Sequence, residues 1–270
     1  MDDAEGGGGA GGRGRARATA RLKHRWEAGR CRKANLQHHY DVSNAFYRMW
    51  LDERMVYSCA YYKTASDTLD QAQAQKLDHI CRKLVLKPGE SLLDIGCGWG
   101  GLIFWAAQHY GVKASGITLS QNQFDHVSAK IAELGLAGQV DVRLLDYVDL
   151  PEDRLYDKIA SVGMFEHVGI ANYPRYFGKM YRILKPGGLA MNHGITQTYV
   201  GVDSLGSGVG EFVEEYVFPG GQLAHVSRVV QGLGAAGLEL IDAYAFREHY
   251  ARTLWPWVVR RDTTPGARRP

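Results

Sequence analysis

The 270-residue sequence lacks any apolar run of the roughly eighteen residues that a membrane-spanning helix needs. Its first residues also lack the apolar core of a secretory signal. Cysteine is scarce, and the spacings between its copies match neither a zinc site nor a CxxC redox pair. The four cysteines are Cys31, Cys59, Cys81 and Cys97. We therefore expect a cytoplasmic protein with reduced thiols and no metal site.

Acidic residues are almost absent between Arg13 and Lys33, where the sequence has nine Lys or Arg residues and the single acid Glu27. The net charge of the whole chain is only +3, so basic charge is concentrated here. The Gly- and Arg-rich sequence cannot form a core, and we expect residues 1–34 to be a disordered, solvated leader. Two other interpretations stay open: an arm that binds nucleic acid, and a tether to anionic lipid that gains about 1 kcal/mol per basic residue.

Residues 35–270 are expected to form one domain in which strands and helices alternate. An aromatic-rich stretch, residues 35–62, predicts short helices and loops before the first long helix. The expected strands are Ser91–Ile95, Lys113–Thr118, Val140–Leu145, Lys158–Val162, Leu189–His193 and Glu239–Phe246. The expected helices are Leu69–Leu84, Gly101–Tyr110, Asn122–Leu134, Tyr173–Leu184 and Val226–Ala236. This order predicts an α/β fold with a helical N-terminal segment and a mostly parallel, doubly wound sheet, whose ligands bind at the carboxyl ends of the strands.

The sequence LLDIGCGWGG, residues 92–101, stands between the first expected strand and the helix that follows it. Its glycines let the backbone turn sharply and approach a ligand, and they also fit the dinucleotide pattern GxGxxG, which is weak evidence by itself. That pattern expects an acid about twenty residues later to bind a ribose, but GITLS stands there, at residues 116–120. Asp94, just before the glycines, suits the cationic amino-acid end of a sulfonium cofactor and would repel a pyrophosphate. The loop therefore predicts binding of S-adenosylmethionine.

Several separated blocks of sequence resemble one enzyme family. They are HYDVSN at 39–44, YSCAY at 57–61, LLDIGCGWGG at 92–101, GITLS at 116–120, GMFEHVG at 163–169 and NHGIT at 192–196. From Asn35 to about Trp257, the chain resembles the cyclopropane-fatty-acyl-phospholipid synthase family, which includes the mycolic acid cyclopropane synthases. The glycine loop is shared with many methyltransferases, whereas YSCAYY, FEHVG and the pair His249–Tyr250 are more specific to this family. The resemblance implies a Rossmann-like class I methyltransferase with S-adenosylmethionine as its cofactor.

The resemblance also implies two groups of site residues. Added to Asp94, the positions that match cofactor contacts are Tyr57, Ser58, Gly96, Gly98, Thr118, Leu119 and Gln123, with Asp146 and Tyr147 at the adenine. The catalytic positions, which hold a bicarbonate ion in the family, are Cys59, Glu166, His193, Ile195 and Tyr250. Four of them, Cys59, Glu166, His193 and Tyr250, also have a plainer interpretation by themselves, such as a helix cap for Glu166 or a packing role for Tyr250.

The implied reaction explains why such residues would occur together. An isolated alkene is a weak nucleophile, so the enzyme must hold it in line with the sulfonium methyl group. Methyl transfer leaves a carbocation, which must lose a proton to a base screened from water before the ring closes, and bound bicarbonate would serve as that base. Tyr40 and Phe165 are candidates to ease the positive charge through their rings. We therefore expect conversion of an unsaturated phospholipid acyl chain to a cyclopropane chain, at the inner face of the membrane.

Other functions stay open within the same fold. In one alternative the product is a methyl-branched lipid. In another the acceptor is a small amine, although an amine needs no such base. A cofactor-binding protein without turnover is a further alternative. The Asn-Pro-Pro-Tyr type of motif used by nucleic-acid methyltransferases is absent after the fourth expected strand, so we expect no nucleic-acid substrate.

The end of the sequence departs from the family, whose members continue with further helices and a last antiparallel strand. After Arg260 the sequence predicts a polar tail, residues 260–265, without that strand. The expected strand Glu239–Phe246 would then lack its usual neighbour and present an unpaired edge. We expect reduced stability, or a homo-oligomer that covers this edge.

Overall fold

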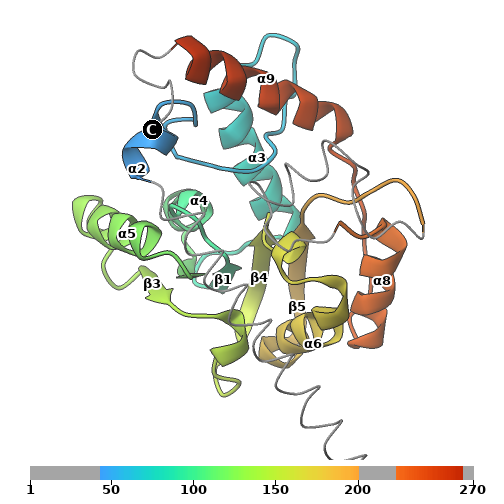
Figure 1. Ribbon diagram of the computed structural model, residues 1–270. Helices are drawn as coiled ribbons and strands as arrows, with labels where there is room; N and C mark the ends of the chain where they lie inside the picture. Colours follow the sequence, from blue (N-terminus) through green and yellow to red (C-terminus); the bar gives the residue numbers. More distant parts are fainter. Residues whose placement is uncertain (1–42, 201–222, 264–270) are drawn as a thin grey trace, which may run out of the picture.

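The computed structural model describes residues 43–200 and 223–263 (Figure 1). The expected leader, Cys31 and Tyr40 lie outside the described residues. Five strands form one sheet in which every neighbouring pair is parallel. In the spatial order β3-β2-β1-β4-β5 they are Val140–Leu144, Lys113–Thr118, Ser91–Ile95, Tyr156–Val162 and Leu184–His193. The strand order reverses between β1 and β4, and in such sheets this is where a ligand crevice opens at the carboxyl ends.

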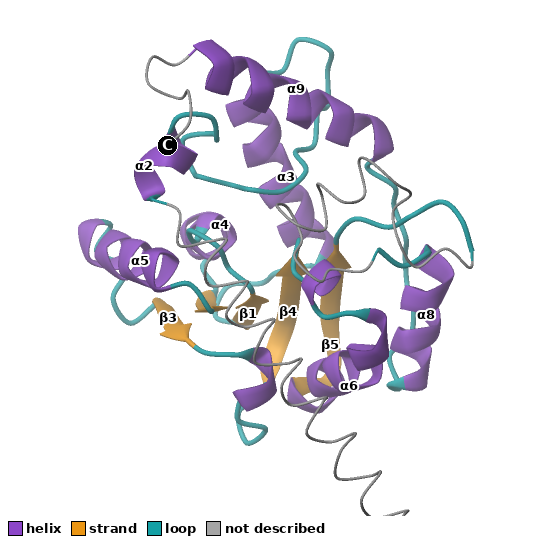
Figure 2. Cartoon of the chain, in the orientation of Figure 1, coloured by secondary structure: helices purple, strands orange, loops and turns teal. Residues whose placement is uncertain are grey.

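Helices cover both faces of the sheet (Figure 2). The helices are α2 Asn44–Arg48, α3 Leu69–Lys83, α4 Gly101–Tyr110, α5 Gln121–Glu133, α6 Tyr173–Ile183, α8 Val226–Ala235 and α9 Arg247–Thr263. Short 3-10 turns follow β3 and β4, at η1 Tyr147–Asp149, η2 Phe165–His167 and η3 Ile170–Asn172. Leu92 of β1 packs in a cluster with α3 and α4, whereas Leu93 packs in a cluster with α6 and α8. Adjacent side chains thus enter opposite layers, as the pleat of a strand buried on both faces requires.

Local sequence explains where several helices begin and end. Thr68 and Gln71 form a capping box at the start of α3, in which each side chain accepts a hydrogen bond from the backbone N–H of the other. The hydroxyl of Ser120 accepts a hydrogen bond from the N–H of Gln123 at the start of α5. Gly111 ends α4 in the left-handed conformation, with φ of 65°.

A third core cluster joins the aromatic N-terminal part of the described chain to α9. Its largest members are Tyr47, Trp50, Tyr62, Trp99 and Trp257. Two side chains of α9 also accept hydrogen bonds from backbone N–H groups: Ala60 N donates to Thr253 Oγ1 at 3.0 Å, and Tyr62 N donates to His249 Nδ1 at 3.1 Å. In Figures 1 and 2, α9 crosses over α3 on the side of the carboxyl ends of the strands. The segment before α3 is therefore held between α3 and α9.

The expected α/β architecture is confirmed, and β1, α4 and β2 have the expected bounds. The bounds of α3, α5, α6, α8, β3 and β4 differ from expectation by at most two residues at either end. Strand β5 begins at Leu184 rather than Leu189, so it includes the sequence KPGG, which lies between the expected helix Tyr173–Leu184 and the expected strand Leu189–His193. Tyr156 pairs with Leu184 before a shift of register, and Gly187 takes up the turn with φ of 74°.

The expected strand Glu239–Phe246 is wrong. Its residues pair with no strand and are mostly exposed. The rings of Tyr244 and Phe246 pack against Tyr61 at centroid distances of 6.2 and 5.4 Å. A strand needs a neighbour for its N–H and C=O groups, and among the described residues nothing pairs with the outer side of β5. The edge of the sheet is therefore β5, and the expected homo-oligomer stays a prediction.

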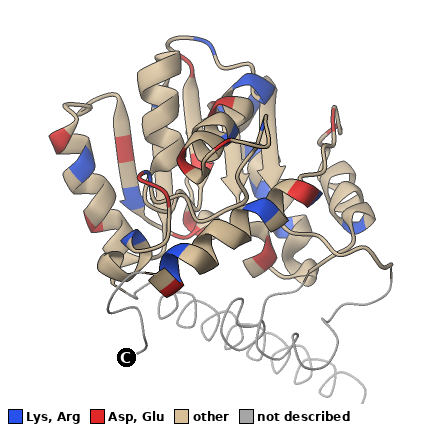
Figure 3. Ribbon diagram, turned by 90° about the horizontal axis from the view of Figure 1, so that it is seen from above, with Lys and Arg blue, Asp and Glu red and all other residues tan. Residues whose placement is uncertain are grey.

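The expected polar tail after Arg260 is also wrong in part, because residues 260–263 form the last turn of α9. Arg260 donates to the carbonyl of Leu51 at 2.8 Å and to Asp70 at 2.7 Å, which fixes this turn against α3. Figure 3 shows Lys and Arg interspersed with Asp and Glu over the described elements. In the described part of the chain, no helix is both long and apolar enough to cross a membrane.

Candidate functional site

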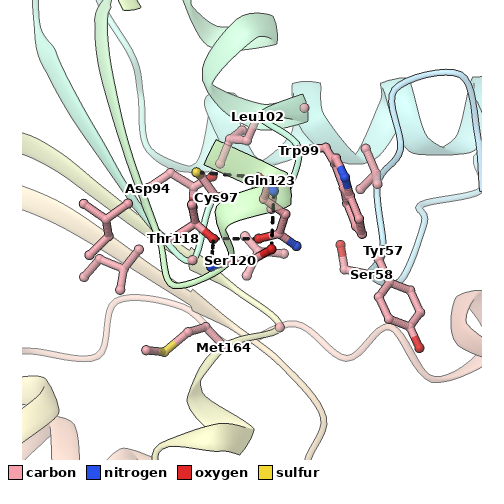
Figure 4. A pocket seen from close by; sticks show the side chains of 18 of the residues that line it. Tyr57, Ser58, Asp94, Cys97, Trp99, Leu102, Thr118, Ser120, Gln123 and Met164 are labelled. Atoms are coloured by element: carbon pink, nitrogen blue, oxygen red, sulfur yellow. Dashed lines mark hydrogen bonds between the residues drawn. The ribbon is translucent and has the colours of Figure 1, made fainter. Parts of the chain in front are cut away.

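A pocket opens at the carboxyl ends of β1 and β2, between the glycine loop and the segment 55–58 (Figure 4). It contains about 1050 Å³ of space without atoms, part of which is open to solvent. We call it the cofactor pocket. All ten residues expected to contact the cofactor line it, namely Tyr57, Ser58, Asp94, Gly96, Gly98, Thr118, Leu119, Gln123, Asp146 and Tyr147.

The glycine loop approaches its surroundings more closely than side chains would allow. Gly96 and Gly98 have φ of 81° and 55°, in the left-handed region. The N–H groups of Gly96 and Cys97 both donate to the carbonyl of Ile117 at 3.0 Å, which holds the loop against β2. A Cβ on Gly116 would lie 2.7 Å from Cys97 Sγ, so the glycine that begins GITLS makes room for the loop.

The segment after β2 is held by its own side chains. Thr118 Oγ1 donates to Gln123 Oε1 at 2.6 Å and accepts from the N–H of Ser120 at 3.2 Å (Figure 4). Because Thr118 engages the amide oxygen, the amide nitrogen of Gln123 is left to donate elsewhere. This arrangement fixes a polar group at the pocket, where a ribose hydroxyl could accept from it.

Asp94 is a buried carboxylate at the end of β1, with 3% of its surface exposed. Among the described residues, its Oδ1 atom has no hydrogen-bond partner. Burial raises the pKa of Asp94 to about 7, and the charge of Lys76 opposes that rise. An unpaired carboxylate oxygen at this place fits the ammonium group at the amino-acid end of S-adenosylmethionine.

Glu166, in η2, meets the chain that follows β5. The N–H of Ile195 donates to Glu166 Oε1 at 2.7 Å. A Cβ on Gly194 would collide with the ring of Phe165 and lie 2.8 Å from Glu166 Oε1, so glycine is required for this approach. Glu166 Oε2 and His193 Nδ1 are both buried without a hydrogen-bond partner in the described structure. Two unpaired buried polar atoms mark a place where a polar ligand would be satisfied.

Cys59 and Tyr250 complete the second group of site residues. Cys59 Sγ lies 3.9 Å from the carbonyl oxygen of Phe246, whose ring centroid is 5.2 Å from that of His193. Tyr250, on α9, is close enough to Glu166 and Cys59 for both to raise the pKa of its hydroxyl, in addition to the larger effect of burial. The structure therefore brings together the five expected catalytic positions, which we call the anion site: Cys59, Glu166, His193, Ile195 and Tyr250.

Burial sets the protonation states of the anion site. It raises the pKa of Cys59 to about 11 and that of Glu166 to about 7, and it lowers the pKa of His193 to about 3. At neutral pH the thiol and the imidazole are therefore uncharged, and Glu166 keeps a proton more readily than an exposed glutamate does. Among the described residues, no group of three or more His, Cys, Asp or Glu side chains is arranged to hold a metal ion.

The sequence interpretation missed several residues of the cofactor pocket. Lys76 lines the pocket although it lies in α3 and is only 1% exposed. Its position on the apolar face of that helix, one turn before Ile80, was the available signal. Met164 and His167 line the pocket too. Phe165, proposed from its residue type, is 1% exposed and packs in the core beside Gly194.

Comparisons with known proteins agree with this geometry. Residues 28–263 match the family model described as mycolic acid cyclopropane synthetase. A probable fatty acid methyltransferase of Pseudomonas putida is 51% identical over 222 residues, which are 82% of this chain and 56% of that protein. The cyclopropane-fatty-acyl-phospholipid synthase of Escherichia coli K12 is 41% identical over 225 residues, which are 82% of this chain and 55% of that protein. The chain thus spans about half the length of these curated relatives.

A solved structure is similar over most of its length. Mycolic acid cyclopropane synthase CmaA1, complexed with SAH and CTAB, superposes with a TM-score of 0.79 and 33% sequence identity. The match covers 87% of this chain and 84% of that one. Because the family model matches most of the sequence and the solved relative has the same Rossmann-like fold, the chain belongs to the mycolic acid cyclopropane synthetase family.

Proposed function

We propose that the chain is an S-adenosylmethionine-dependent methyltransferase that acts on the double bond of an unsaturated phospholipid acyl chain and gives a cyclopropane chain. The observation that carries this proposal is the presence of two adjoining sites. Ser58 lines the cofactor pocket and is followed directly by Cys59 of the anion site, and Met164 of the pocket stands two residues before Glu166. A cofactor pocket alone fits any methyltransferase, whereas the second site meets a need of an alkene acceptor.

The cofactor pocket fits S-adenosylmethionine, which when bound supplies a methyl group on a positively charged sulfur. Asp94 would accept hydrogen bonds from the amino group of the cofactor, and Gly96 and Gly98 would let the backbone lie against it. Gln123, with its amide oxygen held by Thr118, would donate to the ribose. The complex of the relative CmaA1 with SAH supports this use of the pocket.

The anion site would hold the base that accepts the proton which a methylated alkene must lose. Two of its side chains are poorly suited to be the base itself: the pKa of His193 is lowered to about 3, and Cys59 keeps its proton. Glu166 is already engaged at Oε1 by the N–H of Ile195. The unpaired atoms Glu166 Oε2 and His193 Nδ1 would instead hold a bicarbonate ion, with Tyr250 beside it, as the proton acceptor.

The carbon acceptor is favoured over an amine for the same reason. An amine carries its own removable proton and needs no buried anion next to the cofactor. The names of the two curated relatives, a probable fatty acid methyltransferase and a cyclopropane-fatty-acyl-phospholipid synthase, both refer to acyl chains. They support a lipid acceptor and leave the choice between a ring and a branch to experiment.

The test is to incubate the purified chain with labelled S-adenosylmethionine and vesicles of an unsaturated phospholipid, then to analyse the released acyl chains. We expect a mass gain of one methylene and the high-field proton resonances of a cyclopropane ring. Vesicles with saturated chains are the control and should take up no label. A labelled methyl or methylidene branch would replace the ring in the proposal, and labelling of amines but not of lipid would overturn it.

A further inference from the structure

A buried lysine, Lys76, lines the cofactor pocket, and the proposed reaction gives it no role. Lys76 is 1% exposed and shares the inner face of α3 with Ala72 and Ile80, which are fully buried. Burial of an ammonium group costs free energy unless the group is paired and hydrogen-bonded. The contacts of Lys76 therefore indicate its role.

Lys76 and its neighbour Gln73 hold the segment that carries Tyr57 and Ser58. Lys76 Nζ donates to Ser58 Oγ at 2.9 Å. Gln73 Nε2 donates to the carbonyl oxygens of Val56 at 3.2 Å and of Ser58 at 2.8 Å. Two side chains one turn apart on α3 thus fix both the backbone and the hydroxyl of Ser58.

The contact with Lys76 determines the direction of the Ser58 hydroxyl. An ammonium group has three donors and no acceptor, so the oxygen of Ser58 must accept in this bond. The proton of the hydroxyl then has to point elsewhere, and the described residues offer it no other hydrogen bond. Ser58 is half-buried and lines the pocket. Its hydroxyl is therefore a donor toward the pocket, with a positive charge behind it.

Buried carboxylates balance that charge. Asp52 and Asp94 are 2% and 3% exposed, and both act against the lowering of the Lys76 pKa by burial. The pKa of Lys76 is about 8, so the ammonium form prevails at neutral pH. Figure 4 shows Ser58 and Asp94 on opposite sides of the pocket. The pocket thus has a donor backed by a cation on one side and an unpaired carboxylate on the other.

We propose that Lys76 is a positioning residue that makes Ser58 the donor for the carboxylate group of the bound cofactor, while Asp94 accepts from its ammonium group. This inference rests on the proposed function, because it requires a ligand with an amino-acid end. A hydrogen bond to a carboxylate is stronger than one between neutral groups, and the charge of Lys76 strengthens it further.

Calorimetry with two ligands tests the role of Lys76 without any turnover. S-adenosylhomocysteine has the amino-acid end, whereas 5′-methylthioadenosine has the adenosine but lacks both the carboxylate and the ammonium group. We expect Lys76→Met to weaken binding of S-adenosylhomocysteine about tenfold or more and to leave binding of methylthioadenosine unchanged. Ser58→Ala should show the same selectivity. The double variant should lose no more affinity than Lys76→Met alone, because Lys76 acts through Ser58.

Lys179→Met is the matched control, since Lys179 is also buried, at 7% exposure, but donates to the carbonyl of Leu150 outside the pocket. We expect it to lower stability and to leave both affinities unchanged. Equal losses for the two ligands in Lys76→Met, or additive losses in the double variant, would overturn the proposal. If Lys76→Met does not fold, Ser58→Ala decides, because an unchanged ratio of the two affinities refutes a carboxylate contact at Ser58.

Failure of this proposal is distinguishable from failure of the proposed function. Selective weakening of S-adenosylhomocysteine with no methyl transfer to lipid would remove the proposed acceptor and keep the role of Lys76. Methyl transfer to lipid with no ligand selectivity in the variants would refute the role of Lys76 and keep the proposed acceptor.

Discussion

Gly194 packs against the ring of Phe165 so closely that no side chain fits between them. This contact brings the following N–H, that of Ile195, to Glu166. The position of the unpaired Glu166 Oε2 atom therefore depends on a residue that has no side chain. The same dependence gives a first test of how the anion site is built.

Gly194→Ala should destabilise the fold by about 1–3 kcal/mol, because the added methyl group forces Phe165 or the chain after β5 to move. The measurement is the free energy of unfolding in urea. Gly234→Ala is the control, since a Cβ there meets nothing within 4 Å and the position lies inside α8. That variant should be neutral or gain a few tenths of a kcal/mol. Equal stability of the two variants would contradict the tight contact at Gly194.

Glu166→Gln should lower turnover about a hundredfold while changing the affinity for S-adenosylhomocysteine less than threefold. The magnitude is that of removing one preorganised group at a reacting centre. The amide keeps an oxygen for the N–H of Ile195, but its NH₂ group cannot accept the hydrogen bond by which Glu166 Oε2 would hold the bicarbonate ion. Turnover and calorimetric affinity are measured on the same preparation. Equal losses in both would move Glu166 from the anion site to the cofactor pocket.

The stability of the protein should also report the protonation of Glu166. Its folded pKa, about 7, lies above the ordinary value of 4.5, so the folded state keeps a proton that the unfolded state releases. The contribution of Glu166 to stability is thus fully present below about pH 4.5 and is lost as the pH rises through 7. One proton changes the free energy of unfolding by at most about 1.4 kcal/mol per pH unit.

The check is the difference in unfolding free energy between the wild type and Glu166→Gln, measured from pH 4.5 to 7.5. Groups common to both proteins cancel in this difference, including His193, whose lowered pKa acts in the opposite direction. We expect the wild type to lose stability relative to the variant with rising pH. A constant difference would show that Glu166 is not buried as an acid with a raised pKa.

Thr253→Val should cost about 1–3 kcal/mol of stability, because it leaves the buried N–H of Ala60 without its acceptor. Valine has nearly the same shape, so the loss would come from the hydrogen bond. Thr263→Val is the control at the exposed end of the same helix, where the hydroxyl bonds only within α9. Thermal unfolding of both variants is the measurement. A loss at residue 263 as large as that at 253 would mean that the docking of α9 does not depend on this contact.

The sequence predicted the part of the fold in which local signals agree. Strand β1, the glycine loop and α4 have the expected bounds because apolar residues stand on both sides of Asp94 and glycines fix the turn. The strand expected at Glu239–Phe246 failed because strand formation depends on a partner, and alternation of side chains cannot supply one. The start of β5 was missed for the opposite reason, since pairing with Tyr156 overrides the Pro and Gly that suggest a stop.

The residues of the site likewise include some that the sequence predicted and others, Lys76 among them, that it did not. The ten expected cofactor positions and the five expected catalytic positions were predicted from motifs, and the structure brings each group together. Lys76 was missed because a lysine on a helix counts as a solvent-facing residue in any pattern of apolar and polar letters. Only the packing of α3 against the segment that carries Ser58 shows that its ammonium group points inward.

The docking of α9 has a consequence for synthesis of the protein. Among the described residues, all those that line the cofactor pocket precede Val168, whereas Tyr250 and Thr253, which accepts from the N–H of Ala60, belong to α9. A ribosome adds about 5–20 residues each second and domains fold as the chain emerges. The residues that α9 contributes to the anion site are therefore synthesised last, and the site is complete only when α9 has docked.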